Sequence, residues 1–169
     1  MEDLVEKAKK GDNEAFTSLI LSLENDLYSI AKMRVKNEDQ INDILQETML
    51  ATYINLPKLK ENKYFKTWII KILINKCNKS FNYKKIVSLE ENDIDKYVGI
   101  NEIQNKKLDF EDIISFLNKE EKTILTLYYY LSYTTKEIAQ ILNKREGTIT
   151  SKILRAKQKI KNKYKGEVE

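Results

Sequence analysis

The residues of this chain best suited to chemistry are the cations and hydroxyls of TTKEIAQILNKREGTITSKILRAKQKI, residues 134–160. Two of the three arginines, Arg145 and Arg155, lie in this stretch, and a guanidinium can form paired hydrogen bonds to guanine or phosphate. Ala139 stands where two helices must approach closely, and Asn143 stands in the turn, where a left-handed backbone is needed. The pattern predicts a helix-turn-helix whose second helix docks in the DNA major groove. An ordinary helical hairpin with a solvated basic face is the alternative.

Few other residues could carry out catalysis. The sequence has no histidine and a single cysteine, Cys77, so imidazole bases, Ser-His or Cys-His pairs, internal disulfides and cysteine-based zinc sites are excluded. The four glycines stand apart, so there is no glycine-rich phosphate loop. The remaining enzymatic alternative is a metal-dependent nuclease, with the carboxylates of Glu38, Asp39, Asp43 and Glu47 as its candidates. We expect instead no enzymatic activity, no cofactor and no metal site.

Composition indicates an all-α protein. Hydrophobic residues make up 41% of the 169 residues, while four glycines and one proline leave few turns and few helix breakers. The net charge is only +4, but the charges are segregated. Residues 58–85 contain nine lysines and one acid, and residues 143–165 contain nine cations and one acid. Residues 86–112, between them, contain eight acids and three lysines. Two basic blocks joined by an acidic bridge are typical of two polyanion-binding units on a tether.

Apolar residues recur at three-to-four spacing along most of the chain, which predicts eight helices in two four-helix units. In the first unit the expected helices lie at 4–8, at 13–31, after a charged turn at 36–40 until Pro57, and at about 64–81. In the second they lie at 110–117, 120–131, 136–142 and 147–163. The expected domains are residues 1–84 and 110–169, which a flexible acidic linker at 85–109 joins.

Several motifs, in this order, resemble those of bacterial extracytoplasmic-function (ECF) sigma factors, the smallest members of the sigma-70 family. GDNEAFTSLILSLENDLYSIA is similar to the opening helices of their region 2, DILQETMLATY to its core-binding motif, and FKTWIIKILINKCNKSF to the promoter-recognition helix that follows. LNKEEKTILTLYYYLSYTTKEIAQILNKREGTITSKILRAKQKI looks like region 4. The resemblance covers nearly all of the chain except the linker. It implies an alternative RNA polymerase sigma factor that directs promoter recognition, −10 melting and transcription initiation.

The resemblance implies that the helix-turn-helix binds the −35 promoter element as duplex DNA. The family's contact positions fall on Arg145, Glu146, Thr148, Thr150, Ser151, Lys152 and Arg155. Several of these contacts should go to phosphates, which set the register, and only a few should read bases. Thr150 stands where many members have a cation, so the preferred −35 sequence does not carry over from relatives.

The resemblance also implies that region 2 opens the −10 element, with a flipped base in a pocket and the single strand on basic and aromatic side chains. The loop at 58–63 corresponds to the family's base-capturing loop. The implied −10 contacts are Lys58, Lys60, Asn62, Lys63, Tyr64, Asn75, Lys76 and Lys79. Phe65 and Trp68, three residues apart, are expected in the core rather than on the strand.

By motif position, one helix of region 2 should contact the clamp helices of the largest polymerase subunit. Its implied contacts are Asp43, Gln46, Glu47 and Leu50. Gln40 and Asn42 replace acids often present in relatives, which weakens the electrostatic part of this contact or shifts it to Glu38 and Asp39. The implied partners are core RNA polymerase, through its clamp helices and flap, promoter DNA and, as for many family members, an anti-sigma factor.

A stand-alone helix-turn-helix transcription regulator is the alternative function. It would explain residues 134–160 equally well, but it assigns no function to DILQETMLATY or to the other basic block, residues 58–85. The stretch MEDLVEKAKKGD is charged rather than apolar, so we expect no signal peptide, and no apolar run approaches a membrane span. The expected location is the cytoplasm, in association with the nucleoid when the protein is bound to polymerase.

Overall fold

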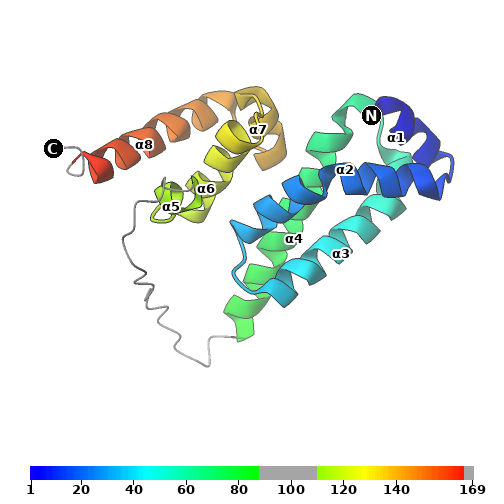
Figure 1. Ribbon diagram of the computed structural model, residues 1–169, viewed down its shortest axis with the longest axis horizontal. Coiled ribbons are helices and arrows are strands. Elements are labelled where there is room, and N and C mark those ends of the chain that lie inside the picture. Colours follow the sequence, from blue (N-terminus) through cyan, green and yellow to red (C-terminus); the bar gives the residue numbers. More distant parts are fainter. Residues whose placement is uncertain (88–109, 166–169) are drawn as a thin grey trace.

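The computed structural model describes residues 1–87 and 110–165, and the regular structure in these ranges is helical (Figure 1). The first unit contains α1 (Glu2–Lys9), α2 (Asn13–Lys32), α3 (Glu38–Asn55) and α4 (Phe65–Val87), and the second contains α5 (Phe110–Ile114), α6 (Lys119–Leu125), α7 (Thr135–Leu142) and α8 (Glu146–Tyr164). The predicted all-α class with two helical units is confirmed. The predicted linker falls mostly on residues 88–109, which lie outside the described residues, and the proposed domain boundaries stay predictions.

Helices α2 and α4 each bury one continuous stripe in the first unit. On α4, Phe65, Ile69, Leu73 and Cys77 follow one another at four-residue spacing, and all four are 0% exposed. On α2, the buried stripe comprises Leu19, Leu23, Leu27 and Ile30. Because burial of such a side chain contributes about 1.5–3 kcal/mol relative to leaving it exposed, these stripes fix which face of each helix remains for function.

Helix α3 begins earlier than its apolar pattern predicts. The charged segment at 36–40 was expected to be a turn, but the helix starts at Glu38 because the Asn37 side chain accepts a hydrogen bond from the Gln40 N–H at 2.8 Å. Glu38 and Asp39 thus occupy the first helical turn, where the helix dipole favours negative charge.

The expected helix at 120–131 is divided in the structure. Helix α6 ends at Leu125 and continues as a π turn at Thr126–Tyr130, which closes with a 3.0 Å hydrogen bond from the Leu131 N–H to the Thr126 carbonyl. The extra residue in this turn shifts the phase of the side chains, so Leu127 is buried whereas Tyr130 is exposed. A search for a 3.6-residue period cannot detect such a turn.

The predicted helix-turn-helix is present as α7 and α8. Thr134 and Glu137 form a capping box at the start of α7, and Asn143 ends it with the expected left-handed backbone, at φ 52° and ψ 50°. The apolar contact between the helices buries Ile138, Ile149 and Ile153. Ile141 is also buried, whereas Leu142 is half-buried.

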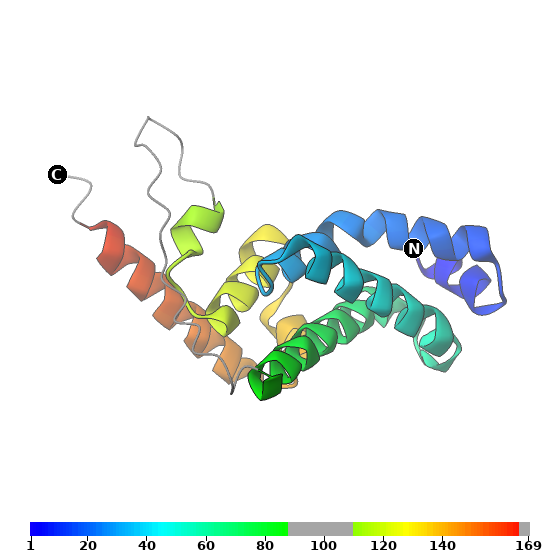
Figure 2. The same cartoon turned by 90° about the horizontal axis from the view of Figure 1, so that it is seen from below.

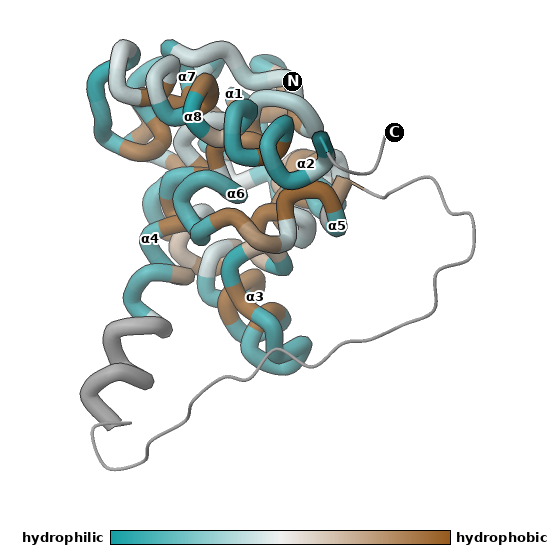
Figure 3. Tube along the Cα trace, turned by 90° about the vertical axis from the view of Figure 1, so that its left-hand side faces the viewer, coloured by the Kyte–Doolittle hydropathy of each residue, from teal (hydrophilic) through white to brown (hydrophobic). Residues whose placement is uncertain are grey.

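The second unit lies against the first along α4, so residues distant in sequence share one core (Figures 1 and 2). Helix α7 makes the main contact with α4. Along the helices, apolar and hydrophilic residues alternate, which Figure 3 shows in brown and teal. None of the helices in residues 1–87 and 110–165 combines the length and the apolar character that crossing a bilayer requires.

Candidate nucleic-acid and polymerase interfaces

The N-cap and the first three turns of α8 carry the residues predicted to bind the −35 element. Arg145 caps the helix with extended backbone, and six of the seven predicted residues are exposed: Arg145, Glu146, Thr148, Thr150, Ser151 and Arg155. Thr148, Ser151 and Arg155 are spaced by three and four residues, so they share one face of the helix. The Ser151 hydroxyl donates to the Gly147 carbonyl at 2.8 Å, and the Thr150 hydroxyl to the Glu146 carbonyl at 3.2 Å. In this conformation both hydroxyls keep a free lone pair for an incoming donor.

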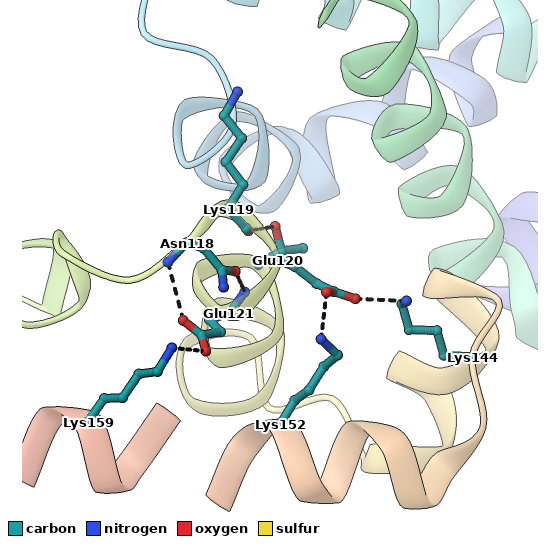
Figure 4. A network of polar contacts seen from close by, with 8 residues as sticks. Asn118, Lys119, Glu120, Glu121, Lys144, Lys152 and Lys159 are labelled. Atoms are coloured by element: carbon teal, nitrogen blue, oxygen red, sulfur yellow. Dashed lines mark hydrogen bonds and ion pairs between the residues drawn. The ribbon is translucent and has the colours of Figure 1, made fainter. Parts of the chain in front are cut away.

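The seventh residue, Lys152, is turned toward α6 instead (Figure 4). Its ammonium group donates to Glu120 Oε2 at 2.7 Å, and Lys144 lies 2.9 Å from Oε1 of the same carboxylate. Burial raises the pKa of Glu120, but the ammonium groups of Lys152 and Lys144 outweigh it and hold that pKa below its ordinary value. The charge of Lys152 is therefore balanced inside the second unit.

The loop at 58–63 is fastened to α1. The Asn62 side chain accepts a hydrogen bond from the Lys9 ammonium at 2.6 Å and donates to Glu6 at 3.0 Å, and these contacts hold the pKa of Glu6 below its ordinary value, with the bond from Asn62 as the main cause. The Lys9 ammonium also donates to the Leu59 carbonyl. The resemblance implies a DNA contact for Asn62, whereas in this structure its amide positions the loop.

Apart from Lys76, the rest of the predicted −10 surface is exposed around that loop. Lys58 and Lys60 lie at the surface, and Tyr64 is 42% exposed with the Lys63 ammonium 4.8 Å from its ring centre. Further along α4, Asn75 and Lys79 are exposed, and the half-buried Lys76 pairs with Glu47 at 2.8 Å. Phe65 is buried and Trp68 half-buried, with ring centres 6.3 Å apart, so the expectation that both belong to the core is confirmed.

The predicted polymerase-binding residues of α3, namely Asp43, Gln46, Glu47 and Leu50, are all exposed. Leu50 is 62% exposed, and Ile54, one turn further along, is 60% exposed. Leu50 and Ile54 thus form an exposed apolar pair, and Ile54 was not predicted as a contact because the motif position identified only Leu50. Asp43 and Glu47 face Lys76 and Lys79 across a shallow cleft, so a metal ion there would meet two ammonium groups. No cluster of three or more metal-binding side chains occurs among the described residues.

The third arginine, Arg34, was missed by sequence reasoning. It follows α2 and is half-buried, and it donates to Thr123 of α6 and to Asn78 of α4, both at 2.6 Å. Burial lowers the pKa of this guanidinium, whereas the neighbouring Cys77 has the opposite effect. No local pattern marks Arg34, because both acceptors lie far away in the sequence and the shorter separation is 44 residues.

Comparison with known proteins accounts for both units. Residues 19–85 match the family model described as Sigma-70 region 2, and residues 107–160 match the one described as Sigma-70, region 4. Together the two matches span well over half of the chain. The ECF RNA polymerase sigma-E factor of Haemophilus influenzae is 26% identical over 179 residues, an alignment that covers 95% of this chain and 93% of that protein.

Two solved structures share the fold. CnrH, solved in complex with the cytosolic domain of CnrY, has a TM-score of 0.74 and 19% identity over 98% of this chain and 97% of its own. The sigma factor RpoE of Bartonella quintana, solved with the anti-sigma factor NepR, has the same TM-score and identity over 87% of this chain and 94% of its own. A stand-alone regulator is not favoured, because the region 2 match accounts for the first unit. The chain therefore belongs to the sigma-70 family, within it to the ECF sigma factors, and acts as an alternative RNA polymerase sigma factor that binds core polymerase and promoter DNA.

Proposed function

We propose that this sigma factor binds the −35 duplex with the start of α8 and captures the −10 single strand with the 58–63 loop and α4, without catalytic chemistry. The observation that carries the −35 part is the pair of exposed guanidinium groups, Arg145 and Arg155, at either end of a hydroxyl-bearing helix face. No carboxylate in the described part of the chain pairs with either of them. Their charges therefore remain available for phosphate or guanine.

On the −35 side, Thr148 and Ser151 lie between the two guanidinium groups and supply hydroxyl contacts. Arg145 and Arg155 clamp phosphate or read guanine, and the hydroxyls set the register on the backbone. Lys152 is assigned a supporting role, since its ammonium group neutralises Glu120 and removes a carboxylate that would repel phosphate. Glu146 accepts a hydrogen bond from Thr135 at 2.6 Å and so steadies the start of α8 against α7.

On the −10 side, Tyr64 offers the only exposed ring among the predicted contacts, at the end of the loop that α1 holds in place. Stacking of a base on such a ring contributes about 1–3 kcal/mol, and it tolerates any base. Lys58, Lys60 and Lys63 surround this ring and follow the phosphates, while Asn75, Lys76 and Lys79 extend the path along α4. No covalent bond is made or broken, because the cost of opening the duplex is offset by the binding energy of the exposed strand.

The polymerase is held by the exposed face of α3. Asp43 and Glu47 pair with basic residues of the clamp helices, and Gln46 adds a hydrogen bond. The exposed apolar pair, Leu50 and Ile54, packs at the centre of the contact. The second unit binds the flap of core RNA polymerase. Because the Bartonella quintana RpoE was solved with an anti-sigma factor, we include an anti-sigma factor among the proposed partners. Action on promoters assigns the protein to the cytoplasm, at the nucleoid when bound to polymerase.

Run-off transcription with bacterial core polymerase, on DNA from the same genome, tests the proposal. New specific transcripts should depend on the protein and should vanish with Arg145→Ala/Arg155→Ala. Lys161→Ala is the matched control, because it removes a cation from α8 outside the proposed surface and should leave transcription unchanged. Leu50→Asp should abolish retention on core polymerase but spare binding of duplex DNA. Retained duplex binding by the unaltered protein, without polymerase association or transcripts, would revive the stand-alone regulator.

A further inference from the structure

Helix α1 lies beside the connection between α3 and α4, which contains the proposed base-capturing loop at 58–63 (Figure 1). Val5 and Ala8 are buried and hold α1 in the first unit. Glu6 and Lys9 each follow one of these buried residues and lie three residues apart, so they share one face of the helix. Hydrogen bonds from both side chains reach the loop, so this face of α1 borders it.

The Lys9 ammonium group bridges the two ends of the loop tip. It donates to the Leu59 carbonyl, and it donates to Asn62 Oδ1 at 2.6 Å. Lys60 and Glu61 form the tip between these two acceptors, and both are exposed. Hydrogen bonds from a charged donor are roughly twice as strong as neutral ones, so one cation fixes two points of the loop that lie three residues apart.

The Asn62 amide is engaged with α1 through both of its polar atoms. Its oxygen accepts from Lys9, and its nitrogen donates to Glu6 Oε2 at 3.0 Å. Lys10 lies 3.1 Å from the other oxygen of the Glu6 carboxylate and balances its charge. A contact between the Asn62 side chain and a base would therefore replace a bond that holds the loop.

The backbone bonds of the loop lie at its ends and leave its tip to other groups. The Leu59 N–H donates to the Leu56 carbonyl and the Tyr64 N–H to the Glu61 carbonyl, both at 3.1 Å. Leu59 and Glu61 themselves have extended backbone. Because fixing each residue of a loop costs conformational entropy, a tip of this kind samples several conformations unless side chains from elsewhere restrict it. Lys9 supplies that restriction.

The shape of the loop matters more for discrimination between bases than for binding of the strand. Hydrogen bonds that read a flipped base require their groups to be placed within about 0.5 Å. Stacking on Tyr64 and ion pairs with phosphates tolerate larger displacements. A loosened loop should therefore lose base selectivity before it loses the single strand.

We propose that Lys9 is a positioning residue for −10 recognition: together with Glu6, its ammonium group holds the loop in the shape that discriminates between bases at the captured position. Asn62 acts through these two side chains and does not touch the base. Helix α1, which precedes the residues matched to Sigma-70 region 2, thereby takes part in promoter selection. This inference rests on the proposed function of the loop in capturing a −10 base.

Holoenzyme assembled from bacterial core polymerase and the full-length protein tests this role on a promoter library. The −10 element of a promoter that the protein transcribes is randomised, each sequence is linked to a barcode in the transcribed region, and barcode counts in the RNA give the base preference at each position. Lys9→Met keeps an unbranched side chain without the charge. It should reduce the preference at one −10 position about tenfold, as expected for loss of a charged donor. Lys9→Arg should restore the preference, because a guanidinium can donate to both acceptors.

Two controls separate positioning from other roles. Lys7→Met removes an exposed cation of the same helix that pairs with Asp3 at 3.4 Å, and it should leave the preference unchanged. A parallel library with a randomised −35 element should give the same preferences for every variant of α1. Circular dichroism checks that each variant is folded. Glu6→Ala, at an exposed position, should lower the −10 preference several-fold and substitutes for Lys9→Met if that variant unfolds.

The double variant Lys9→Met/Asn62→Ala tests whether Asn62 acts through α1. Its −10 preference should be no lower than that of Lys9→Met alone, because the loop has already lost its bridge. A further loss in the double variant, equal to that of Asn62→Ala alone, would assign Asn62 to the base and overturn this part of the proposal.

The proposal on Lys9 and the proposed function of the loop can fail separately. An unchanged −10 preference in Lys9→Met and Glu6→Ala, while Lys60→Ala/Tyr64→Ala impairs transcription, would overturn the positioning role and leave the loop as the proposed −10 surface. Full transcription by Lys60→Ala/Tyr64→Ala would refute the loop itself. Equal losses of the −10 and −35 preferences in Lys9→Met, or failure of Lys9→Arg to restore the −10 preference, would reduce Lys9 to a residue that only stabilises the fold.

Discussion

At the scale of single residues, Glu120 of α6 determines what two neighbouring lysines can do. It pairs with Lys144 in the turn before α8 and with Lys152 on α8, and so keeps both from acting as independent phosphate contacts in this conformation. Arg145 and Arg155 are exposed and have no such acid beside them. The distinction between the supporting cations and the cations proposed to bind DNA therefore depends on one carboxylate.

Glu120→Gln should reveal this role through the pH dependence of stability. The pKa of Glu120 is depressed in the folded protein, so its ion pairs stabilise the fold above pH 4.5, the ordinary value for this group, and this contribution is lost as the pH falls below it. We expect the free energy of unfolding to drop by about 0.5–1 kcal/mol at pH 7, as is usual for partly exposed pairs, and the difference to close once the pH falls below the pKa of Glu120 in the folded protein. Urea denaturation measures it. Glu24→Gln, at an exposed carboxylate of α2, should show no such convergence; a pH-independent difference in Glu120→Gln would contradict the ion-pair account.

Arg145→Ala should change the salt dependence of −35 duplex binding. If the guanidinium neutralises one phosphate, the slope of log K against log salt should decrease in magnitude by about 0.9. Titrations by anisotropy at several salt concentrations give this slope, and Lys161→Ala should leave it unaltered. A loss of affinity with an unchanged slope would assign Arg145 to a base instead of a phosphate, and no change in either would remove it from the interface.

At the scale of elements, the hydrogen bonds at the two ends of α7 determine the geometry of the helix-turn-helix more than its surface residues do. The capping box of Thr134 and Glu137 starts α7, and the left-handed Asn143 ends it, with a 2.9 Å hydrogen bond from the Lys144 N–H to the Ala139 carbonyl. These local bonds set the angle at which α8 leaves the turn.

Thr134→Ala should therefore destabilise α7 without touching the proposed DNA surface. We expect the free energy of unfolding to decrease by about 1 kcal/mol, the usual cost of a lost N-cap. Thr17→Ala is the matched control, because Thr17 is exposed inside α2 and bonds only to the Asn13 carbonyl of its own helix; it should be neutral or slightly stabilising. Thermal unfolding followed by circular dichroism compares the two, and equal effects would show that the cap does not limit stability.

At the scale of the whole molecule, the proposed function requires the two units of one chain to reach two promoter elements. The 22 residues from 88 to 109 can span at most about 75 Å when fully extended. This length, together with the width of the two units, matches the distance of about 85 Å between the centres of the −35 and −10 elements. The largest separation that the two units can reach is thus set by the length of this segment.

Removal of twelve residues from 90–107 should abolish promoter-specific transcription, since the remaining ten span at most about 34 Å. Binding of an isolated −35 duplex should be retained, because α7 and α8 are unaltered. Run-off transcription and duplex anisotropy measure the two properties. A variant of full length, with the same residues replaced by Gly and Ser, should recover initiation; transcription by the shortened protein would show that the two units need not span this distance.

The positions of most helices and the family of this protein could be predicted from local sequence patterns. Apolar periodicity located the helices, Asn143 located the turn, and the order of the motifs indicated the sigma-70 family. These features depend on residues within one or two helical turns of each other, so the chain displays them directly. The π turn at Thr126–Tyr130 was not predicted because it depends on a local change in the backbone hydrogen-bond pattern. The early start of α3 was not predicted because it depends on a single capping side chain.

By itself, then, the sequence determined the helical class, the helix-turn-helix and the family, because each follows from neighbouring residues. Only the tertiary structure decided which polar side chains are already engaged. Lys152 reaches Glu120 across 32 residues and Arg34 reaches Thr123 across 89. A long cationic side chain can bond to any acceptor within its reach, and only the packing of α6 against α8 and of the second unit against α4 brings these acceptors near.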